Sequence, residues 1–323
     1  TLDNLLVTLK LNNGITGYGE AAIARHITGE TVAQTTANIK DAAKFLKNYS
    51  IDDYLSLSQK LKDRYPQNPC VRASLEMAVF DSLAKYLKVP LWKCFGRQME
   101  SLVSDITIVI GTLEETQKQT RLFFKQGFRA FKIKIGKNEN LDLKRVAAVH
   151  AIAKGSKIYL DANQGFNAKQ TLSFLKELKK LEISVDMIEQ PVECDDFAGL
   201  AKVTREGGVP VCADESVRSL EDALKIIKEK AANIINIKTM KTGIIESREI
   251  VFAAKAAGLK LMIGGMMESS LSMTASAHLA VGLGGFDYVD LDTPFFIKGD
   301  REKNPFLSSK GVYALSKVKP GIG

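Results

Sequence analysis

The chain has 323 residues, 45% hydrophobic and 25% charged, with a formal net charge of +8. A chain of this length and composition can bury one large core together with a smaller unit of about 100 residues. Its lysines are spread along expected helices among glutamates, which indicates solvated helix faces and excludes nucleic acid as the expected partner.

The same composition argues against a membrane or secreted protein. No apolar run approaches the roughly 18 residues that a membrane-spanning helix needs, and no signal pattern opens the chain. The four cysteines are widely separated and form no Cys-x-x-Cys pair. We therefore expect a soluble protein of the reducing cytoplasm with no membrane contact.

The first hundred residues predict a small α+β unit. Apolar residues from Leu5 are followed by Asn13-Gly14, which favours a tight hairpin turn because both residues tolerate positive φ angles. Helices are expected over residues 31–46 and 71–87, from their apolar periodicity. The intervening segment 21–29 is expected to be a loop, either a plain surface connection or a lid over a neighbouring pocket.

Eight short apolar runs follow, separated by stretches with helical spacing. They predict strands at residues 106–110, 131–135, 157–160, 185–188, 209–213, 234–237, 259–263 and 286–289. One strand, loop and helix together consume about 25 residues, so this alternation predicts an α/β fold with a parallel (β/α)₈ barrel of the TIM type. The expected domains are an N-terminal α+β capping domain (1–100), the barrel (101–295) and a C-terminal segment (296–323) that packs back on the capping domain.

Charged residues stand at the downstream ends of these runs, at intervals close to one strand-helix unit. They are Lys134, Asp161, Glu189, Asp214, Lys238 and Asp290. In a parallel barrel the carboxyl ends of the strands surround one pocket, so these side chains are expected to be neighbours.

Asp161, Glu189 and Asp214 end three successive strands. Three carboxylates that converge without cationic partners repel one another, which indicates a hard divalent cation among them. Ligands that are all oxygen atoms, in a chain with only three histidines, favour Mg²⁺ over zinc.

Lysines flank these acids on both sides. Lys132 and Lys134 are two apart on one strand and so point to the same face, and Lys238 lies on the opposite side of the acids. A lysine near another ammonium and a dication loses proton affinity, as a general base requires. The arrangement suits removal of a proton next to a carboxylate, with Lys134 and Lys238 on opposite faces of a planar enediolate, so that the carbon inverts.

The last strand ends in Asp290-Leu291-Asp292, which places two more acids on one face. They could hold a positive group of the substrate, such as a free ammonium, or they could cap a helix or pair with a nearby basic residue. Thr107 on the first strand and Met266-Met267-Glu268 after the seventh are positioned to line the same pocket. For the two methionines, packing is the alternative interpretation.

Several short sequence motifs in this region resemble those of the muconate-lactonizing branch of the enolase superfamily. They are Lys132-Ile133-Lys134, Asp161-Ala162-Asn163-Gln164-Gly165, Glu189-Gln190-Pro191, Asp214-Glu215-Ser216 and Asn236-Ile237-Lys238-Thr239-Met240-Lys241-Thr242-Gly243. Gly17-Tyr18-Gly19-Glu20 resembles the start of the same family's capping domain. The Asp290-x-Asp292 ending and the segment 264–269 are similar to dipeptide epimerases, whose commonest members interconvert L-Ala-L-Glu and L-Ala-D-Glu.

The resemblance implies roles for the residues that match it. By this resemblance Asp161, Glu189 and Asp214 hold Mg²⁺, Lys134 and Lys238 exchange the α-proton, Lys132 helps to hold the substrate carboxylate, Asp290 and Asp292 take the dipeptide's amino terminus, and Thr107, Met266, Met267 and Glu268 touch its backbone. The expected protein is thus a cytoplasmic isomerase of cell-wall peptide metabolism that acts on a dipeptide, with a homo-oligomer as its expected state.

Two other interpretations compete with this one. The same scaffold could carry an o-succinylbenzoate synthase, a muconate cycloisomerase or an N-acylamino acid racemase, whose substrates lack a free ammonium. A barrel that binds a metal and a ligand without turnover is the third, and nothing in the sequence favours it, because both proton-transfer lysines and all three acids are present.

Overall fold

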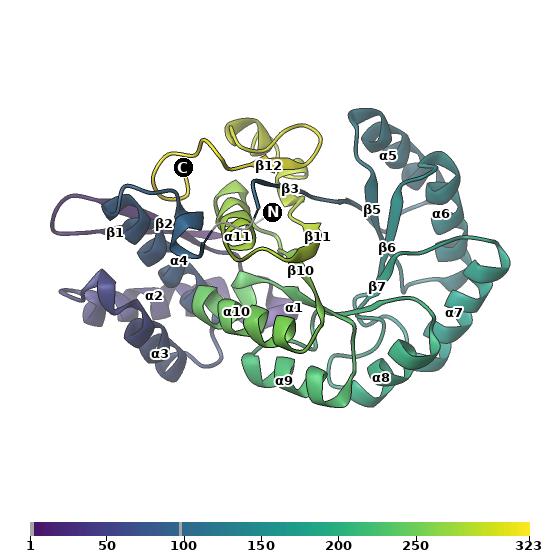
Figure 1. Cartoon of the computed structure of the whole chain (residues 1–323), viewed down its shortest axis with the longest axis horizontal. Coiled ribbons are helices and arrows are strands. Elements are labelled where there is room, and N and C mark those ends of the chain that lie inside the picture. The colour runs from purple at the N-terminus through teal and green to yellow at the C-terminus, as the bar shows by residue number, and fades with distance from the viewer. Residues whose placement is uncertain (1–2, 97–98) are drawn as a thin grey trace.

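The computed structural model describes residues 3–96 and 99–323. Its main body is an α/β barrel, and a smaller N-terminal domain lies beside the barrel helices α10 and α11 (Figure 1). Helix α10 comprises Thr239–Ala256 and helix α11 comprises Ser270–Leu283. No helix in the described part of the chain is long and apolar enough to cross a membrane.

Eight parallel strands form one sheet, in the order β11-β10-β9-β8-β7-β6-β5-β4, and this sheet is the predicted (β/α)₈ barrel. The strands are β4 (Ile106–Ile108), β5 (Ala130–Lys134), β6 (Lys157–Asp161), β7 (Met187–Glu189), β8 (Val211–Ala213), β9 (Ile234–Ile237), β10 (Lys260–Gly264) and β11 (Phe286–Asp290). The bounds predicted from the sequence differ from these by at most two residues.

Helices follow the strands and cover the outside of the barrel (Figure 1). Besides α10 and α11 they are α5 (Leu113–Gln126), α6 (Glu139–Ile152), α7 (Ala168–Lys180), α8 (Phe197–Glu206) and α9 (Leu220–Glu229). Most begin at a side-chain cap, for example the capping box that Thr112 and Glu115 form at the start of α5.

The first and last strands of the barrel meet at a seam that uses a side chain as well as backbone bonds. The Asp105 N–H donates to the Val289 carbonyl at 2.8 Å. Further along the seam, the Thr107 N–H donates to Asp292 Oδ2 at 2.6 Å. A carboxylate thus takes the place of a ladder acceptor, which fixes Asp292 against β4.

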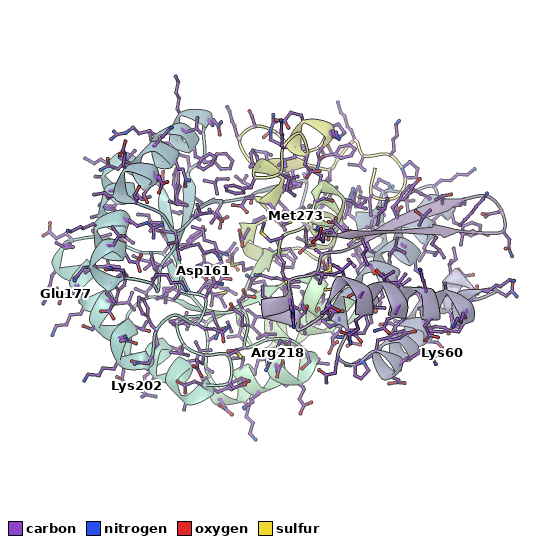
Figure 2. The ribbon with its side chains drawn as sticks, turned by 180° about the vertical axis from the view of Figure 1, so that it is seen from behind. Lys60, Asp161, Glu177, Lys202, Arg218 and Met273 are labelled. Carbon is purple, nitrogen blue, oxygen red and sulfur yellow. The ribbon has the colours of Figure 1, made fainter. Side chains whose placement is uncertain are left out.

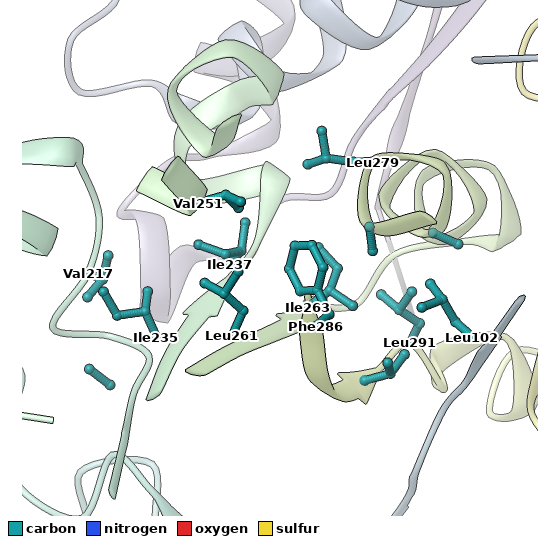
Figure 3. Packing of buried hydrophobic residues seen from close by; sticks show 14 of the residues in the cluster. Leu102, Val217, Ile235, Ile237, Val251, Leu261, Ile263, Leu279, Phe286 and Leu291 are labelled. Atoms are coloured by element: carbon teal, nitrogen blue, oxygen red, sulfur yellow. The ribbon is translucent and has the colours of Figure 1, made fainter. Parts of the chain in front are cut away.

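Two apolar layers hold the barrel together. Outward-facing residues of β9 and β10, such as Ile237 and Ile263, pack against the surrounding helices (Figure 3). A separate inward-facing cluster comprises Tyr159, Met187, Cys212, Ile234, Met262 and Tyr288. This cluster fills the lumen below the polar strand ends, so the polar residues surround a closed floor and not a pore.

The N-terminal domain consists of a hairpin and helices. Strand β1 (Leu5–Lys10) pairs antiparallel with β2 (Thr16–Ala21), and Gly14 in the turn has a φ of 87°, as the Asn13-Gly14 pair predicts. The predicted helices are confirmed as α2 (Val32–Leu46) and α4 (Pro69–Tyr86). A further helix, α3 (Tyr54–Arg64), was not predicted, because only Leu57 and Leu61 are buried in an otherwise polar sequence.

The sequence predicted a loop over residues 21–29, but part of this segment is helical. Residues Arg25–Thr28 form the short helix α1, which ends at Gly29 with a φ of 75°. A single helical turn has too little periodicity to be recognised from sequence, and Gly29 is the one local signal for its end.

The C-terminal segment contacts both domains. Strand β12 (Val312–Ala314) pairs antiparallel with β3 (Ser101–Val103). Near the end of the chain, the Gly321 N–H donates to the Val89 carbonyl at 2.9 Å, and the Ile322 N–H donates to Asp81 Oδ1 at 2.8 Å. These bonds hold the segment against the end of α4.

A carboxylate from the N-terminal domain caps part of a barrel helix. Helix α10 is interrupted at Gly243, which has a φ of 80° and a ψ of −178°. Just after this point, Glu76 Oε2 accepts hydrogen bonds from the N–H groups of Ile244 at 2.6 Å and Ile245 at 3.0 Å. A Cβ atom at position 243 would lie 2.6 Å from the same carboxylate, so only glycine fits there.

Candidate active site

The carboxyl ends of the barrel strands surround a cavity of about 450 Å³. Its walls come from both domains, because Ala24 and Ile27 of the segment 21–29 line it together with barrel residues. The predicted site residues that line it are Thr107, Lys132, Lys134, Lys238, Met266, Met267, Asp290 and Asp292. The segment 21–29 therefore contributes to the pocket and is more than a surface connection.

Glu268 does not line the cavity, contrary to the role expected for it. Its side chain is fully buried, and its carboxylate accepts hydrogen bonds from the Met266 N–H at 2.7 Å and from the Ser272 hydroxyl. Burial raises the pKa of Glu268 to about 7. We assign it to holding the turn behind the two methionines, because a turn with free N–H groups needs a buried acceptor.

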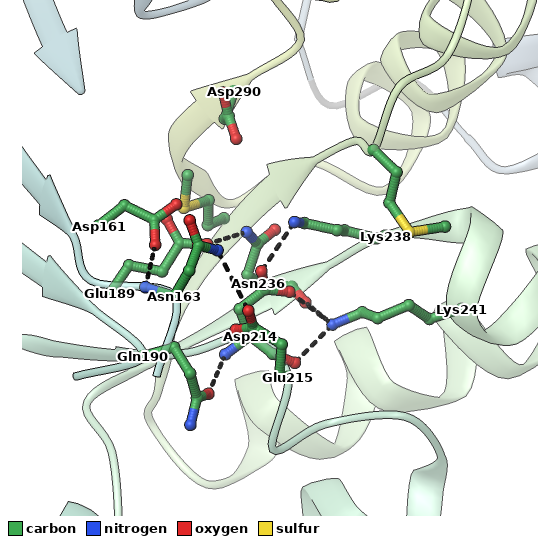
Figure 4. Close-up of polar contacts among 12 residues, drawn as sticks. Asp161, Asn163, Glu189, Gln190, Asp214, Glu215, Asn236, Lys238, Lys241 and Asp290 are labelled. Carbon is green, nitrogen blue, oxygen red and sulfur yellow. Dashed lines mark hydrogen bonds and ion pairs between the residues drawn. The ribbon is translucent and has the colours of Figure 1, made fainter. Parts of the chain in front are cut away.

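The predicted metal ligands lie at the ends of three neighbouring strands, although their oxygens do not all lie within 4.8 Å of one another. Asp161 and Glu189 are direct partners in the ladder between β6 and β7, and Asp214 immediately follows the last residue of β8. All three side chains are buried. Figure 4 shows them at the strand ends, with Asp290 on the far side of the barrel mouth.

The acids are not without cationic partners, and that premise of the sequence analysis is wrong. The Nζ atom of Lys132 lies 3.1 Å from Asp161 Oδ2, 2.9 Å from Glu189 Oε2 and 2.6 Å from Asp290 Oδ2. Burial by itself would lower the pKa of Lys132, but Asp290 and the other acids outweigh it and raise the pKa well above its ordinary value. A fixed ammonium therefore bridges acids that would otherwise repel one another.

The two expected proton-transfer lysines each contact one of these acids. Lys134 Nζ donates to Asp161 Oδ2 at 2.6 Å, and Lys238 Nζ donates to Asp214 Oδ2 at 2.7 Å. Burial would lower the pKa of Lys238, but Asp214 and Glu189 outweigh it and raise the pKa. The sequence analysis expected Lys238 to lose proton affinity, but its pKa is raised because its nearest charged neighbour is the Asp214 carboxylate.

Lys241 is a further lysine of the site, and the sequence analysis assigned it no role. It follows Lys238 by one helical turn, and its Nζ donates to Asp214 Oδ1 at 2.8 Å and to the Asp214 carbonyl at 2.6 Å. Figure 4 shows both lysines reaching Asp214. Burial would raise the pKa of Asp214, but these two cations hold it far below its usual range. The i, i+3 spacing of the lysines was the available signal.

Amide side chains next to the acids hold them in place. Asn236 Nδ2 donates to Glu189 Oε1 at 2.7 Å, and Gln190 Oε1 accepts from the Asp214 N–H at 2.9 Å. Each amide is adjacent to an acid or two residues from a site lysine in the sequence. The Asn236 amide thus orients the Glu189 carboxylate, and Gln190 holds the backbone at Asp214.

The donor set of the three predicted ligands suits a hard cation. All three offer carboxylate oxygens, and Glu189 Oε2 is buried with no hydrogen-bond donor, although the Lys132 ammonium lies 2.9 Å away. Burial raises the pKa of Glu189 to about 8, and Asp161 adds to this effect. An additional positive charge here would stabilise the ionised form of Glu189, so these residues fit Mg²⁺.

A second group of acids lies on the other side of the barrel mouth. Within residues 3–96 and 99–323, the three acids whose oxygens all lie within 4.8 Å of one another are Asp105, Asp290 and Asp292. Asp105 is 1% exposed, and neither of its oxygens has a hydrogen-bond partner. Burial, with the charge of Asp290, raises its pKa well above the usual range and raises that of Asp292 to about 6.

Sequence reasoning missed Asp105. It directly precedes β4, at the upstream end of the strand, where the sequence predicted no site residue. Its spacing of two from Thr107 placed it on the inward face of the same strand, which was the signal that could have revealed it.

Comparison with known proteins identifies the family. A family model described as "Enolase C-terminal domain-like" matches residues 115–323. The chain belongs to the enolase superfamily. Among its relatives, the "Hydrophobic dipeptide epimerase" of Citrifermentans bemidjiense is 44% identical over 330 residues, which cover 100% of this chain and 90% of that protein.

Solved structures agree with this assignment. The substrate-liganded complex of the L-Ala-D/L-Glu epimerase from Bacillus subtilis has a TM-score of 0.96 and 30% identity, covering 99% of this chain and 90% of that one. The dipeptide epimerase from Enterococcus faecalis V583, complexed with Mg and L-Leu-L-Tyr, has a TM-score of 0.93 and 29% identity, covering 99% and 91%. This enolase-superfamily member is therefore an isomerase related to dipeptide epimerases.

Proposed function

We propose that the protein is a Mg²⁺-dependent dipeptide epimerase that inverts the α-carbon of the C-terminal residue of its substrate. The observation that carries the proposal is the set of residues that line one cavity. This cavity is lined by Lys134 from β5 and Lys238 after β9, and its wall between the last strand and the first carries Asp290 and Asp292. A dipeptide has the two matching features, a weakly acidic α-proton next to a carboxylate and a free ammonium at the other end.

In the proposed mechanism the two lysines act on opposite faces of the α-carbon. One lysine, as the neutral amine, takes the α-proton, and the electron pair of the broken C–H bond moves into the carboxylate to form an enediolate. The other lysine, as the ammonium, returns a proton to the opposite face, and the configuration inverts. Reversal of the two roles gives the reverse reaction.

Asp161, Glu189 and Asp214 would hold the Mg²⁺ ion. Bound there, the ion supplies positive charge that favours the negative charge developing on the substrate carboxylate. Lys132 is buried among Asp161, Glu189 and Asp290, so we assign it to balancing their charge. It also lines the cavity, which keeps it within reach of a substrate carboxylate.

At the other end of the cavity, Asp290 and Asp292 would take the ammonium. Asp292 Oδ2 already accepts the Thr107 N–H, and Asp290 Oδ2 is occupied by Lys132. One oxygen of each carboxylate therefore remains for the substrate. A charge-assisted hydrogen bond to each would orient the peptide along the cavity.

We infer that apolar dipeptides are preferred over L-Ala-L-Glu, the substrate suggested by the sequence. Ile27, Val109, Met267 and Phe296 form apolar walls of the cavity. The 44% identical relative from Citrifermentans bemidjiense is named a hydrophobic dipeptide epimerase. Both observations support burial of an apolar side chain in the pocket.

A dipeptide library in D₂O tests the proposed function. We expect one deuterium to enter the α-carbon of the C-terminal residue, read by mass, together with formation of the epimer. L-Ala-L-Glu and N-acetylated dipeptides belong in the same library, since exchange confined to N-acyl compounds would favour an N-acylamino acid racemase. Absence of exchange with every dipeptide would contradict the proposal.

Metal analysis of two variants tests the ion site. Asp214→Asn should lower the Mg²⁺ content and abolish exchange, whereas Asp105→Asn, in the second acidic group, should retain the ion. The bound metal is measured by elemental mass spectrometry after dialysis. The opposite pattern would place the ion between Asp105, Asp290 and Asp292.

A further inference from the structure

The sequence word Gly17-Tyr18-Gly19-Glu20 has no part in the mechanism above. The structure explains its glycines by close packing, because a Cβ atom would lie 2.2 Å from the Ala78 carbonyl at position 17 and 2.0 Å from the Ser74 carbonyl at position 19. Strand β2 therefore lies directly on the backbone of α4. This contact brings the end of β2, and with it Glu20, to the barrel.

Glu20 is buried against the start of barrel helix α11. Glu20 is only 3% exposed to solvent. Oε1 accepts the Ser269 N–H at 2.9 Å, and Oε2 accepts the Ser269 hydroxyl at 2.5 Å and the Ser272 N–H at 3.3 Å. Two N–H groups at the beginning of α11 are thus satisfied by a carboxylate from the other domain.

The segment that Glu20 holds is a wall of the cavity. Residues 265–267 line the pocket just before Ser269. Asn4 Nδ2 donates both to Glu20 Oε1 at 2.6 Å and to the Met267 carbonyl at 2.8 Å, so the N-terminal domain also fixes the wall from a second direction. On the barrel side, the Thr293 hydroxyl donates to the Met266 carbonyl at 2.9 Å.

We propose that Glu20 is a positioning residue that fixes the turn 265–269, whose first three residues line the cavity, and thereby supports the affinity for the dipeptide. The proposal rests on the epimerase function proposed above. The proton-transfer lysines belong to β5 and to the start of α10, and Glu20 contacts neither. Loss of Glu20 should therefore weaken substrate binding and leave the proton transfer itself intact.

Glu20→Gln is the informative substitution, with Glu20→Ala as the larger change. Glutamine keeps the shape and one acceptor oxygen, but its NH₂ group takes the place of the other oxygen and cannot accept the Ser269 or Ser272 N–H that it faces. We expect KM for the best dipeptide to rise roughly tenfold with kcat within about twofold, as loss of a charge-assisted bond implies. Independently of activity, hydrogen exchange of the peptide 265–272 should become faster.

Asp81→Asn is the matched control. Asp81 is another buried acid of this domain that accepts two backbone N–H groups, from Tyr18 at 2.8 Å and Ile322 at 2.8 Å, and it does not line the cavity. The substitution Asp81→Asn should lower the melting temperature, while KM and the hydrogen exchange of residues 265–272 stay as in the wild type.

The outcomes separate this inference from the proposed function. An active wild type with unchanged KM in Glu20→Gln overturns the positioning role and leaves the epimerase intact. A similar rise in KM for Asp81→Asn also overturns it, because the effect would then follow general stability. A wild type inactive on every dipeptide contradicts the proposed function, while faster exchange at 265–272 in Glu20→Gln would still show that Glu20 holds the wall.

Discussion

Asp214 and Asp105 are both buried acids inside the barrel mouth, yet their surroundings shift their pKa values in opposite directions. Asp214 contacts the ammonium groups of Lys238 and Lys241, and its pKa is held far below the usual range against the effect of burial. The Asp105 carboxylate has no hydrogen-bond partner and faces Asp290 and Asp292, and its pKa is strongly raised, mainly because of burial.

The difference extends to the groups around them. On the side of Asp214, four lysines contact the predicted metal ligands and balance their charge. On the side of Asp105, Lys132 contacts Asp290, and no other lysine or arginine among the described residues forms an ion pair with these three acids. The second side therefore has more acid than its one lysine balances, and a cationic substrate group can neutralise it.

The largest expected effect comes from breaking the lysine side. Lys134→Met and Lys238→Met each remove one proton carrier, and general acid-base catalysis typically contributes about 10² to 10⁴ in rate. We expect epimer formation to fall by about 10³-fold or more in both variants, measured by chiral chromatography. Retention of wild-type epimerisation by either variant would be incompatible with two opposed proton carriers.

Removing the charge of the acidic side should act next most strongly. Asp290→Asn combined with Asp292→Asn removes two charge-assisted contacts to the ammonium, so kcat/KM for free dipeptides should fall by about 10²-fold. An N-acetylated dipeptide has no ammonium and serves as the control substrate. If its residual turnover falls equally, the two acids do not recognise the amino terminus.

Asp105→Asn should change the pH dependence of stability. Because the folded-state pKa of Asp105 is raised, its contribution to stability is fully present below its unfolded pKa of about 3.9 and is lost as the pH rises toward the folded value. The variant lacks this loss, so its free energy of unfolding relative to the wild type should increase by up to about 1.4 kcal/mol per pH unit from pH 5.

Denaturant unfolding of both proteins at pH 5 and pH 7 measures this difference. Asp214→Asn is the comparison, because it leaves Lys238 and Lys241 without their acid and should destabilise the protein by about 3 kcal/mol or more. Equal pH dependence of Asp105→Asn and the wild type would mean that Asp105 is ionised in the folded protein.

The smallest effect concerns the apolar wall near the acidic side. Phe296 lines the cavity and packs edge-on against Phe123, with ring centroids 6.2 Å apart. Phe296→Ala should lower kcat/KM about tenfold for dipeptides with large apolar side chains and much less for L-Ala-L-Ala. Equal losses for both substrates would show that this ring does not contact the substrate side chain.

The sequence predicted the barrel and most of the lining because both follow from local periodicity. A strand-helix repeat places Asp161 and Glu189 in one register regardless of what surrounds them. Charge balance was not predictable in this way. Whether an acid meets a lysine depends on side-chain direction across the lumen, which is why the partners of Asp214 and the isolation of Asp105 were missed.

Contacts between the domains were also beyond the reach of the sequence. Glu76 is separated from Ile244 by 168 positions, and nothing in either local pattern indicates that they meet. Figure 2 shows the molecule from behind with its side chains, with Lys60 in the N-terminal domain and Asp161 and Arg218 in the barrel.

The glycine opposite Glu76 limits how such proteins can be recombined. A chimera that joins this barrel to a foreign N-terminal half must supply an acid where Glu76 stands, or the second part of α10 begins with unsatisfied amide groups. The same chimera must keep position 243 free of a side chain. The N-terminal domain and the barrel therefore have to match at this contact, and the boundary between them is a poor place for a crossover.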